Sequence, residues 1–180
     1  MKTVLIVEDE KMIRQGIKTM IMRSGVPIET IMECNNGETA LEILKEQEID
    51  VMFTDIRMPK MDGIELVQKM QSLEHIPLTV AISGYDDFAY AVEMLRDGVR
   101  EYILKPIERE KITEILKKLN AEIESRKEKE ENNQKIGYQQ MRHLMLSDEI
   151  SGEEQRTIES QYACLLYTSP SPRDAHDLVC

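Results

Sequence analysis

The side chains of this sequence that could do chemistry come directly after short, mostly apolar runs; they are Glu8, Asp9, Glu10, Asp55, Ser83 and Lys105. Parallel strands end at one edge of a sheet, and the ligand crevice of such a fold lies at that edge. Asp9 and Asp55 on adjacent strands would repel each other unless a cation lay between them. The spacing therefore predicts a cation site.

A hard divalent ion such as Mg²⁺ suits this set, because it binds a few carboxylates, keeps several waters and leaves room for a phosphoryl oxygen. Asp55, ionised beside the ion, is then a candidate nucleophile that forms an aspartyl-phosphate. Lys105 would pair with the phosphoryl group, and the Ser83 hydroxyl would donate a hydrogen bond to it. Lys105 precedes Pro106, and a cis bond there would turn the lysine inward.

Each of these residues also has an ordinary structural interpretation. Acids after a strand often cap the next helix, and we prefer that role for Glu10. Ser83 before Gly84 is typical of a turn, and a lone Lys105 is typical of an exposed surface. The functional interpretation depends on the whole set.

Repeated strand–helix units must position these residues. We expect strands at residues 3–7, 30–33, 51–54, 78–83 and 101–104. The first, third and fourth are apolar nearly throughout, as in strands buried on both faces of a parallel sheet. Apolar spacings of three and four predict helices around residues 12–21, 41–44, 64–70, 88–95 and 107–119. This order predicts an α/β fold with a doubly wound parallel sheet and right-handed crossovers.

The composition narrows the class of protein. The 180 residues carry a net charge of −11, which disfavours a surface that binds nucleic acid or anionic lipid throughout. No apolar run approaches the ~20 residues of a membrane span, and the first run is too short for a signal peptide. The three cysteines form neither a metal-ligand spacing nor an even disulfide framework. We expect a cytoplasmic protein.

The character of the sequence changes after the expected globular domain, residues 1–121. We expect a charged helical linker over residues 122–163, weakened at Asn132 and Asn133, with another short helix at 136–146. Residues 164–180 contain two Ser-Pro steps and no periodicity, which is typical of disorder. They also look like a translated adaptor, so we interpret them as a non-native tail and exclude them from the fold; a genuine flexible C-terminus is the alternative.

Four segments, in this order and spacing, resemble the receiver domain of two-component response regulators: residues 7–10 (VEDE), 50–63 (DVMFTDIRMPKMDG), 83–85 (SGY) and 102–106 (YILKP). The resemblance covers about residues 1–120. It implies a flavodoxin-like, five-stranded sheet in the order 2-1-3-4-5 with a helical C-terminal extension. A sensor histidine kinase is the implied phosphodonor.

The resemblance also implies a role for each matching residue. Asp55 would be the phospho-acceptor and Lys105 the phosphoryl-binding lysine. Ser83 would be the switch hydroxyl, and Tyr102 the aromatic residue that turns inward with it. Mg²⁺ would be bound by Asp9, Asp55 and the backbone carbonyl of Arg57, with Glu8 acting indirectly. The family often has Asp at the position of Glu8, and glutamate is a common variant.

A finer similarity, over residues 83–91 (SGYDDFAYA), 98–99 and 102–106, is to receivers fused to AraC-type DNA-binding domains. In that subgroup a charged helical linker and two helix-turn-helix motifs follow the receiver. Residues 122–163 resemble the start of such a linker, and no basic recognition helix follows. We therefore expect a fragment without specific DNA binding of its own. The face from Ser83 to Lys105 is where the family often dimerises.

Two enzyme classes built on similar folds do not fit this sequence, whereas one other signalling role does. A phosphatase of the haloacid dehalogenase type needs an acid two residues after its Asp nucleophile, where this chain has Arg57. A flavodoxin cradles phosphate after its first strand, where Glu8, Asp9 and Glu10 would repel it. We therefore do not expect an enzyme. A stand-alone receiver that acts by protein docking remains an alternative to one that controls transcription.

Overall fold

The computed structural model describes residues 1–84 and 94–146 of the chain. Its sheet has five strands: β1 (Thr3–Val7), β2 (Thr30–Cys34), β3 (Val51–Asp55), β4 (Leu78–Ser83) and β5 (Glu101–Leu104). All neighbours pair in parallel, in the order β2-β1-β3-β4-β5. The expected doubly wound sheet and its strand order are confirmed.

The described helices are α1 (Lys11–Met22), α2 (Gly37–Glu46), α3 (Gly63–Met70) and α5 (Arg109–Leu146). The helix expected around residues 88–95 falls mostly within residues 85–93, outside the described part of the chain, and residues 94–96 are helical. The tail expected at residues 164–180 also lies outside the described residues. Within the described ranges, no helix is both long and apolar enough to cross a membrane.

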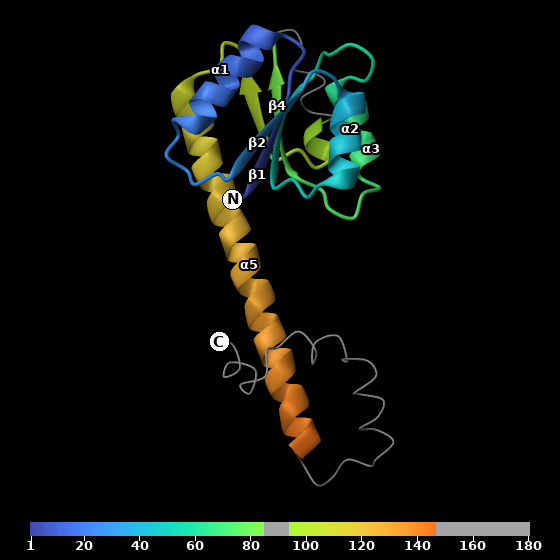
Figure 1. Cartoon of the computed structure of the whole chain (residues 1–180), viewed down its shortest axis with the longest axis vertical. Coiled ribbons are helices and arrows are strands. Elements are labelled where there is room, and N and C mark those ends of the chain that lie inside the picture. The colour runs from blue at the N-terminus through green and yellow to red at the C-terminus, as the bar shows by residue number, and fades with distance from the viewer. Residues whose placement is uncertain (85–93, 147–180) are drawn as a thin grey trace, which may run out of the picture. The chain divides into compact units, whose positions relative to one another are not determined.

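The sheet is the middle layer of three (Figure 1). Helices α1 and the first part of α5 cover one face, and α2 and α3 cover the other (Figure 1). Alternate residues of β1 point to the two faces: Val4 and Ile6 pack under α1 and α5, whereas Leu5 and Val7 pack under α2 and α3. Strands β3 and β4 are buried along their whole length, as their apolar sequences predict.

Short polar side chains cap the N-termini of two helices. Asn36 Oδ1 accepts a hydrogen bond from Thr39 N (3.0 Å) at the start of α2, and Asp62 Oδ1 accepts one from Glu65 N (2.8 Å) at the start of α3. Each such cap stabilises a helix by about 1 kcal/mol.

Helix α1 begins differently. Glu10 occupies its N-cap position, but its side chain makes no capping hydrogen bond, so that part of the expectation for Glu10 is wrong. Glutamate is one methylene longer than the residues that cap well. The Glu10 backbone N–H instead donates to Glu8 Oε1, at 3.3 Å.

Helix α5 is longer than the sequence suggests. It continues through Asn132 and Asn133 to Leu146 as one helix. Asparagine in a helix costs at most about 0.7 kcal/mol relative to alanine, which does not by itself end a helix. The chain divides into two compact units, Met1–Lys127 and Glu128–Cys180, and the apolar residues of α5 up to Ile123 belong to the core of the first.

Candidate functional site

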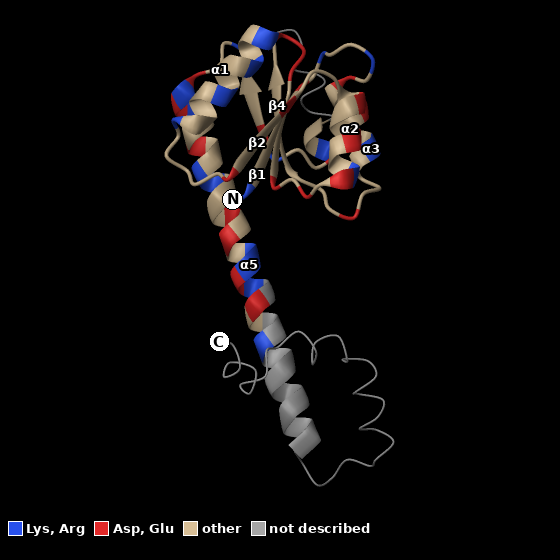
Figure 2. Cartoon of the chain, in the orientation of Figure 1, with Lys and Arg blue, Asp and Glu red and all other residues tan. Residues whose placement is uncertain are grey.

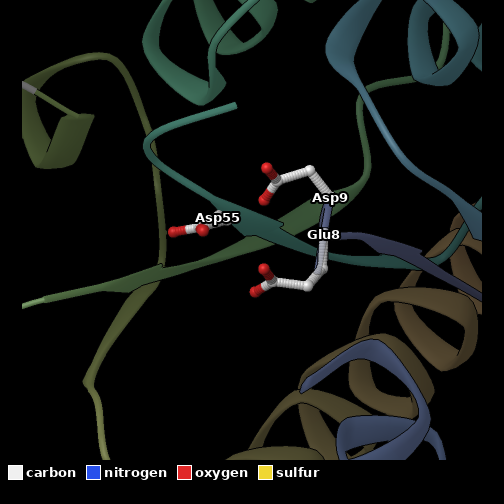
Figure 3. A group of neighbouring side chains, drawn as sticks. All are labelled: Glu8, Asp9 and Asp55. Carbon is white, nitrogen blue, oxygen red and sulfur yellow. The ribbon is translucent and has the colours of Figure 1, made fainter. Parts of the chain in front are cut away.

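Three carboxylates meet at the carboxyl end of the sheet. Glu8 and Asp9 follow β1, and Asp55 is the last residue of the neighbouring strand β3. One oxygen of each lies within 4.8 Å of the others. Figure 3 shows Glu8 and Asp9 reaching from the end of β1 toward the side on which Asp55 lies. The structure thus brings together the three acids that the sequence predicts at one rim.

The three acids differ in their access to solvent. Glu8 is completely buried and Asp55 is 6% exposed, whereas Asp9 is exposed. Asp55 is held firmly, because its Oδ1 accepts a hydrogen bond of 2.8 Å from the backbone N–H of Ile56. The cluster therefore has a buried base and an open mouth at Asp9.

Lys105 supplies a cation to the buried part of the cluster. Its Nζ lies 2.9 Å from Asp55 Oδ2 and 3.1 Å from Glu8 Oε2. The Lys105 backbone N–H donates to the carbonyl of Ser83 at 2.7 Å, which extends the pairing of β4 and β5 by one residue. The bond between Lys105 and Pro106 is cis, the isomer considered from the sequence.

These neighbours shift two ionisation equilibria. Burial, helped by the negative charge of Asp55, raises the pKa of Glu8 to about 7, against an opposing effect of Lys105. Burial alone would lower the pKa of Lys105, but the carboxylates of Asp55 and Glu8 outweigh it and raise the pKa. The site therefore holds one lysine firmly protonated beside an acid that ionises reluctantly.

The donor set fits a hard cation. All of its oxygen atoms belong to carboxylate groups. One of them, Glu8 Oε2, accepts no well-aligned hydrogen bond from any described residue, although the Lys105 ammonium lies near it. A buried carboxylate oxygen in that situation gains from an additional positive charge. Arg57 follows Asp55 by two residues, in the loop before α3. The cluster can hold a metal ion.

The loop after Asp55 is packed so closely that only glycine fits at two positions. A Cβ on Gly63 would lie 2.2 Å from the Asp55 carbonyl oxygen, and the Gly63 N–H donates to the Ile56 carbonyl at 2.8 Å. A Cβ on Gly37 would lie 2.7 Å from the carbonyl oxygen of Met61. In the sequence each of these glycines follows a polar residue and is typical of a turn, and the close packing that requires glycine is a finding of the structure.

Two hydroxyl groups connect β4 to β5 beside the acids. The Tyr102 hydroxyl donates to Ser83 Oγ at 2.9 Å, and the Ser83 hydroxyl donates to the Gly84 carbonyl at 2.8 Å. Ser83 is fully buried and Tyr102 is half-buried. The structure therefore joins the two residues that the receiver resemblance implies as a switch pair.

One residue at the site was missed by sequence reasoning. Arg14 of α1 donates from Nη1 to the carbonyl of Glu8 at 2.5 Å. Its place in an amphipathic helix is typical of a solvated charge. A cation near a helix N-terminus is, however, electrostatically unfavourable, and that mismatch is the signal that could have identified it.

Comparisons with known proteins agree with this geometry. The family described as "Response regulator receiver domain" matches residues 4–117. An uncharacterized response regulatory protein of Vibrio cholerae is 31% identical over 121 residues, which are 67% of this chain and 46% of that protein. The uncharacterized transcriptional regulatory protein YesN of Bacillus subtilis is 31% identical over 123 residues, 68% of this chain and 33% of YesN. The chain thus spans less than half the length of these two relatives.

Solved structures give the same result. The receiver (REC) domain of AraT, a response regulator from Geobacillus stearothermophilus, matches with a TM-score of 0.61 and 34% identity, covering 69% of this chain and 97% of that one. A two-component transcriptional regulator AraC from Clostridium phytofermentans matches with a TM-score of 0.63 and 32% identity, covering 72% and 99%. Sequence motifs, strand order, acidic cluster and relatives agree, and the chain belongs to the response regulator receiver domain family.

Proposed function

We propose that residues 1–121 form a phosphorylation-controlled receiver in which Asp55 accepts a phosphoryl group from a sensor histidine kinase. The observation that carries the proposal is the contact of 2.9 Å between Asp55 Oδ2 and Lys105 Nζ, next to Glu8 and Asp9. A carboxylate at the end of a central strand, with a fixed cation beside it, is poised to form an acyl phosphate.

The roles of the residues follow from their positions. The Ile56 N–H holds Oδ1 of Asp55, so Oδ2, the oxygen beside Lys105, would attack the phosphorus. The new bond joins Oδ2 to phosphorus, and the bond from phosphorus to the donor breaks. Lys105 would then pair with the transferred phosphoryl oxygens, because its ammonium already lies at that oxygen.

Mg²⁺ is the proposed cofactor. Asp9, Asp55 and the backbone carbonyl of Arg57 would bind it, and Glu8 would act indirectly by keeping Lys105 and the acidic cluster in place. When bound, the ion would neutralise charge on the phosphoryl group during transfer.

Ser83 and Tyr102 are the proposed switch. The Ser83 hydroxyl would leave the Gly84 carbonyl and donate to the phosphoryl group, a stronger acceptor. Tyr102 would follow, because its hydroxyl already donates to Ser83 Oγ. Phosphorylation of Asp55 would in this way change the position of Tyr102 on β5.

The output that we propose is transcriptional control through an AraC-type DNA-binding domain joined by the helical linker at residues 122–163. Two of the similar proteins support this output by their names. YesN is called a transcriptional regulatory protein, and the similar structure from Clostridium phytofermentans is called a transcriptional regulator AraC. DNA would be bound by that domain only, and the face from Ser83 to Lys105, with exposed Leu104 on β5, could serve homodimerisation in the cytoplasm. The alternative is a stand-alone receiver that acts by docking to other proteins.

The phosphorylation proposal is tested with acetyl phosphate and Mg²⁺, followed by intact mass. Asp55→Asn keeps the shape of the side chain but removes the nucleophile, so it should gain no phosphoryl mass, whereas the parent should gain one hydroxylamine-sensitive group. Asp50→Asn, at the opposite end of β3, is the matched control and should be phosphorylated like the parent. Equal phosphorylation of Asp55→Asn would refute the assignment.

The output proposal has a separate test. The genomic sequence downstream of codon 163 should encode a basic helix-turn-helix pair in the same reading frame. A stop codon there would instead favour the stand-alone receiver.

A further inference from the structure

The side chain of Arg14 connects three parts of the fold next to the acidic cluster. Its Nη1 lies 2.5 Å from the carbonyl oxygen of Glu8 and 3.4 Å from that of Asp9. Its Nε lies 3.5 Å from Glu33 Oε2, on β2, and only 16% of the side chain is exposed. The guanidinium, which extends from α1, thus contacts both β2 and the turn between β1 and α1 that carries Glu8 and Asp9.

This placement is electrostatically unusual for a helix. Acidic residues normally stabilise the first turn, but α1 has none there, and its charged residues are all basic (Figure 2). The loop carbonyls compensate, because they accept hydrogen bonds from a group that the helix N-terminus disfavours. Arginine suits the position, since its planar fork carries several donors in fixed directions.

The two carbonyls that Arg14 contacts belong to the peptide groups on either side of the Asp9 Cα. Holding both groups fixes the direction in which the Asp9 side chain leaves the backbone. Other contacts in the turn fix Glu8: its N–H donates to the Cys34 carbonyl at 3.2 Å, and its Oε1 accepts from Glu10 N at 3.3 Å. Asp9, the exposed acid of the cluster, depends more on Arg14.

We propose that Arg14 is a positioning residue: by binding the carbonyls of Glu8 and Asp9, it aims the Asp9 carboxylate at the cation site it shares with Asp55. The inference rests on the proposed function, because it concerns the same site. Glu33 completes the arrangement by holding the guanidinium from the other side.

Geometry and charge have opposite effects here, which makes the proposal testable. The positive charge of Arg14 repels a cation, so removing the charge alone should tighten cation binding. Loosening the turn should weaken cation binding. Arg14→Lys keeps the charge and loses the planar fork, and it therefore isolates the geometric effect.

Two measurements on Arg14→Lys test the proposal. The first is the affinity for Mg²⁺ by calorimetry, which should weaken about tenfold, the lower end of the range for residues that orient metal ligands. The second is amide hydrogen exchange of residues 8–10 in EDTA, which should become faster in the variant. The second readout needs neither metal nor phosphorylation.

Lys18→Gln is the matched control. Lys18 pairs with the same carboxylate, Glu33, at 2.6 Å, and it lies on the same helix as Arg14. If Arg14 acts through the turn, Lys18→Gln should bind Mg²⁺ like the parent. An equal loss of affinity in Lys18→Gln would show that only the pairing of Glu33 matters and would overturn the proposal.

Arg14→Gln gives a second way to refute the idea. If Arg14→Lys matches the parent while Arg14→Gln binds Mg²⁺ more tightly, Arg14 acts only as a charge and the proposal is wrong. Failure of the proposed function is recognised separately, because the parent itself would then gain no phosphoryl mass whatever Arg14→Lys does to Mg²⁺ affinity and amide exchange.

Discussion

Lys105 Nζ and Asp55 Oδ2 lie 2.9 Å apart, although 50 positions separate the two residues in the chain. The same ammonium lies 3.1 Å from the fully buried Glu8. One lysine therefore balances two carboxylates that would otherwise repel each other. Any group that binds to Asp55 Oδ2 must also make room for the Lys105 ammonium. A chemical change at Asp55 is therefore coupled to the position of Lys105.

Lys105→Gln should destabilise the protein at pH 8 in EDTA. Breaking a buried ion pair costs about 3–5 kcal/mol, and we expect about 1–3 kcal/mol here because Lys105 is 23% exposed. Urea unfolding measures the loss. The double variant with Glu8→Gln should lose less than the sum of the single changes, because one of the uncompensated charges is gone. Lys111→Gln, which removes an exposed pair with Glu114, should change stability by less than about 0.5 kcal/mol. Parent-like stability of Lys105→Gln would contradict the pairing.

Glu8 should make stability depend on pH. Its pKa is raised from 4.5 to about 7 in the folded protein, so folding favours the protonated form. The resulting stability is fully present below about pH 4.5 and is lost as the pH rises through about 7, with a total change on the order of 3 kcal/mol. Urea unfolding in EDTA between pH 5 and 8 should show this decline in the parent but not in Glu8→Gln. Identical pH profiles of the two proteins would exclude the effect.

Much of the site could be predicted because a parallel sheet brings the carboxyl ends of its strands to one edge. Once the apolar run before Asp55 is recognised as a strand, its end must lie near the end of the strand before Glu8. The same reasoning brings Ser83 and Lys105 to this edge. These predictions needed the positions of the strands, which the apolar pattern indicates, and the order of the strands, which the resemblance to receiver domains implies.

What the sequence does not define depends on side-chain reach and local packing. The contact of Lys105 with Glu8, and that of Arg14 with two carbonyls, require the directions of individual side chains. In the sequence Gly63 is typical of a turn. Only the structure shows that the Asp55 carbonyl oxygen occupies the space that a Cβ on Gly63 would need. Helix α5 continues through Asn132 because the helix propensities of ordinary residues differ by little. Such small differences do not define a helix end where glycine and proline are lacking.

Gly63→Ala should be strongly destabilising. The new Cβ would lie 2.2 Å from the carbonyl oxygen of Asp55, a backbone atom that cannot move aside without displacing the site. We expect a loss of about 2–3 kcal/mol by urea unfolding, the upper range for overpacking, and slower phosphorylation by acetyl phosphate. Gly16→Ala is the matched control. It lies within α1, where the added carbon would meet no described atom within 4 Å apart from its chain neighbours and the backbone of its own helix, and it should be neutral or stabilise by up to about 1 kcal/mol. A Gly63→Ala variant as stable as Gly16→Ala would refute the packing argument.

Ser83→Ala and Tyr102→Phe each remove one hydroxyl from the same hydrogen bond, but they should differ in effect. Both keep Asp55, so both should be phosphorylated to the level of the parent. Ser83→Ala loses the proposed contact with the phosphoryl group, worth ~1.5–3 kcal/mol, a large share of a typical coupling energy of ~1–3 kcal/mol. Tyr102→Phe loses only a neutral hydrogen bond of ~0.5–1.5 kcal/mol. The phosphate-dependent change in amide exchange at residues 101–105 should therefore be nearly abolished by Ser83→Ala and only reduced by Tyr102→Phe. If the larger loss occurs in Tyr102→Phe, the signal does not pass from the phosphate through Ser83.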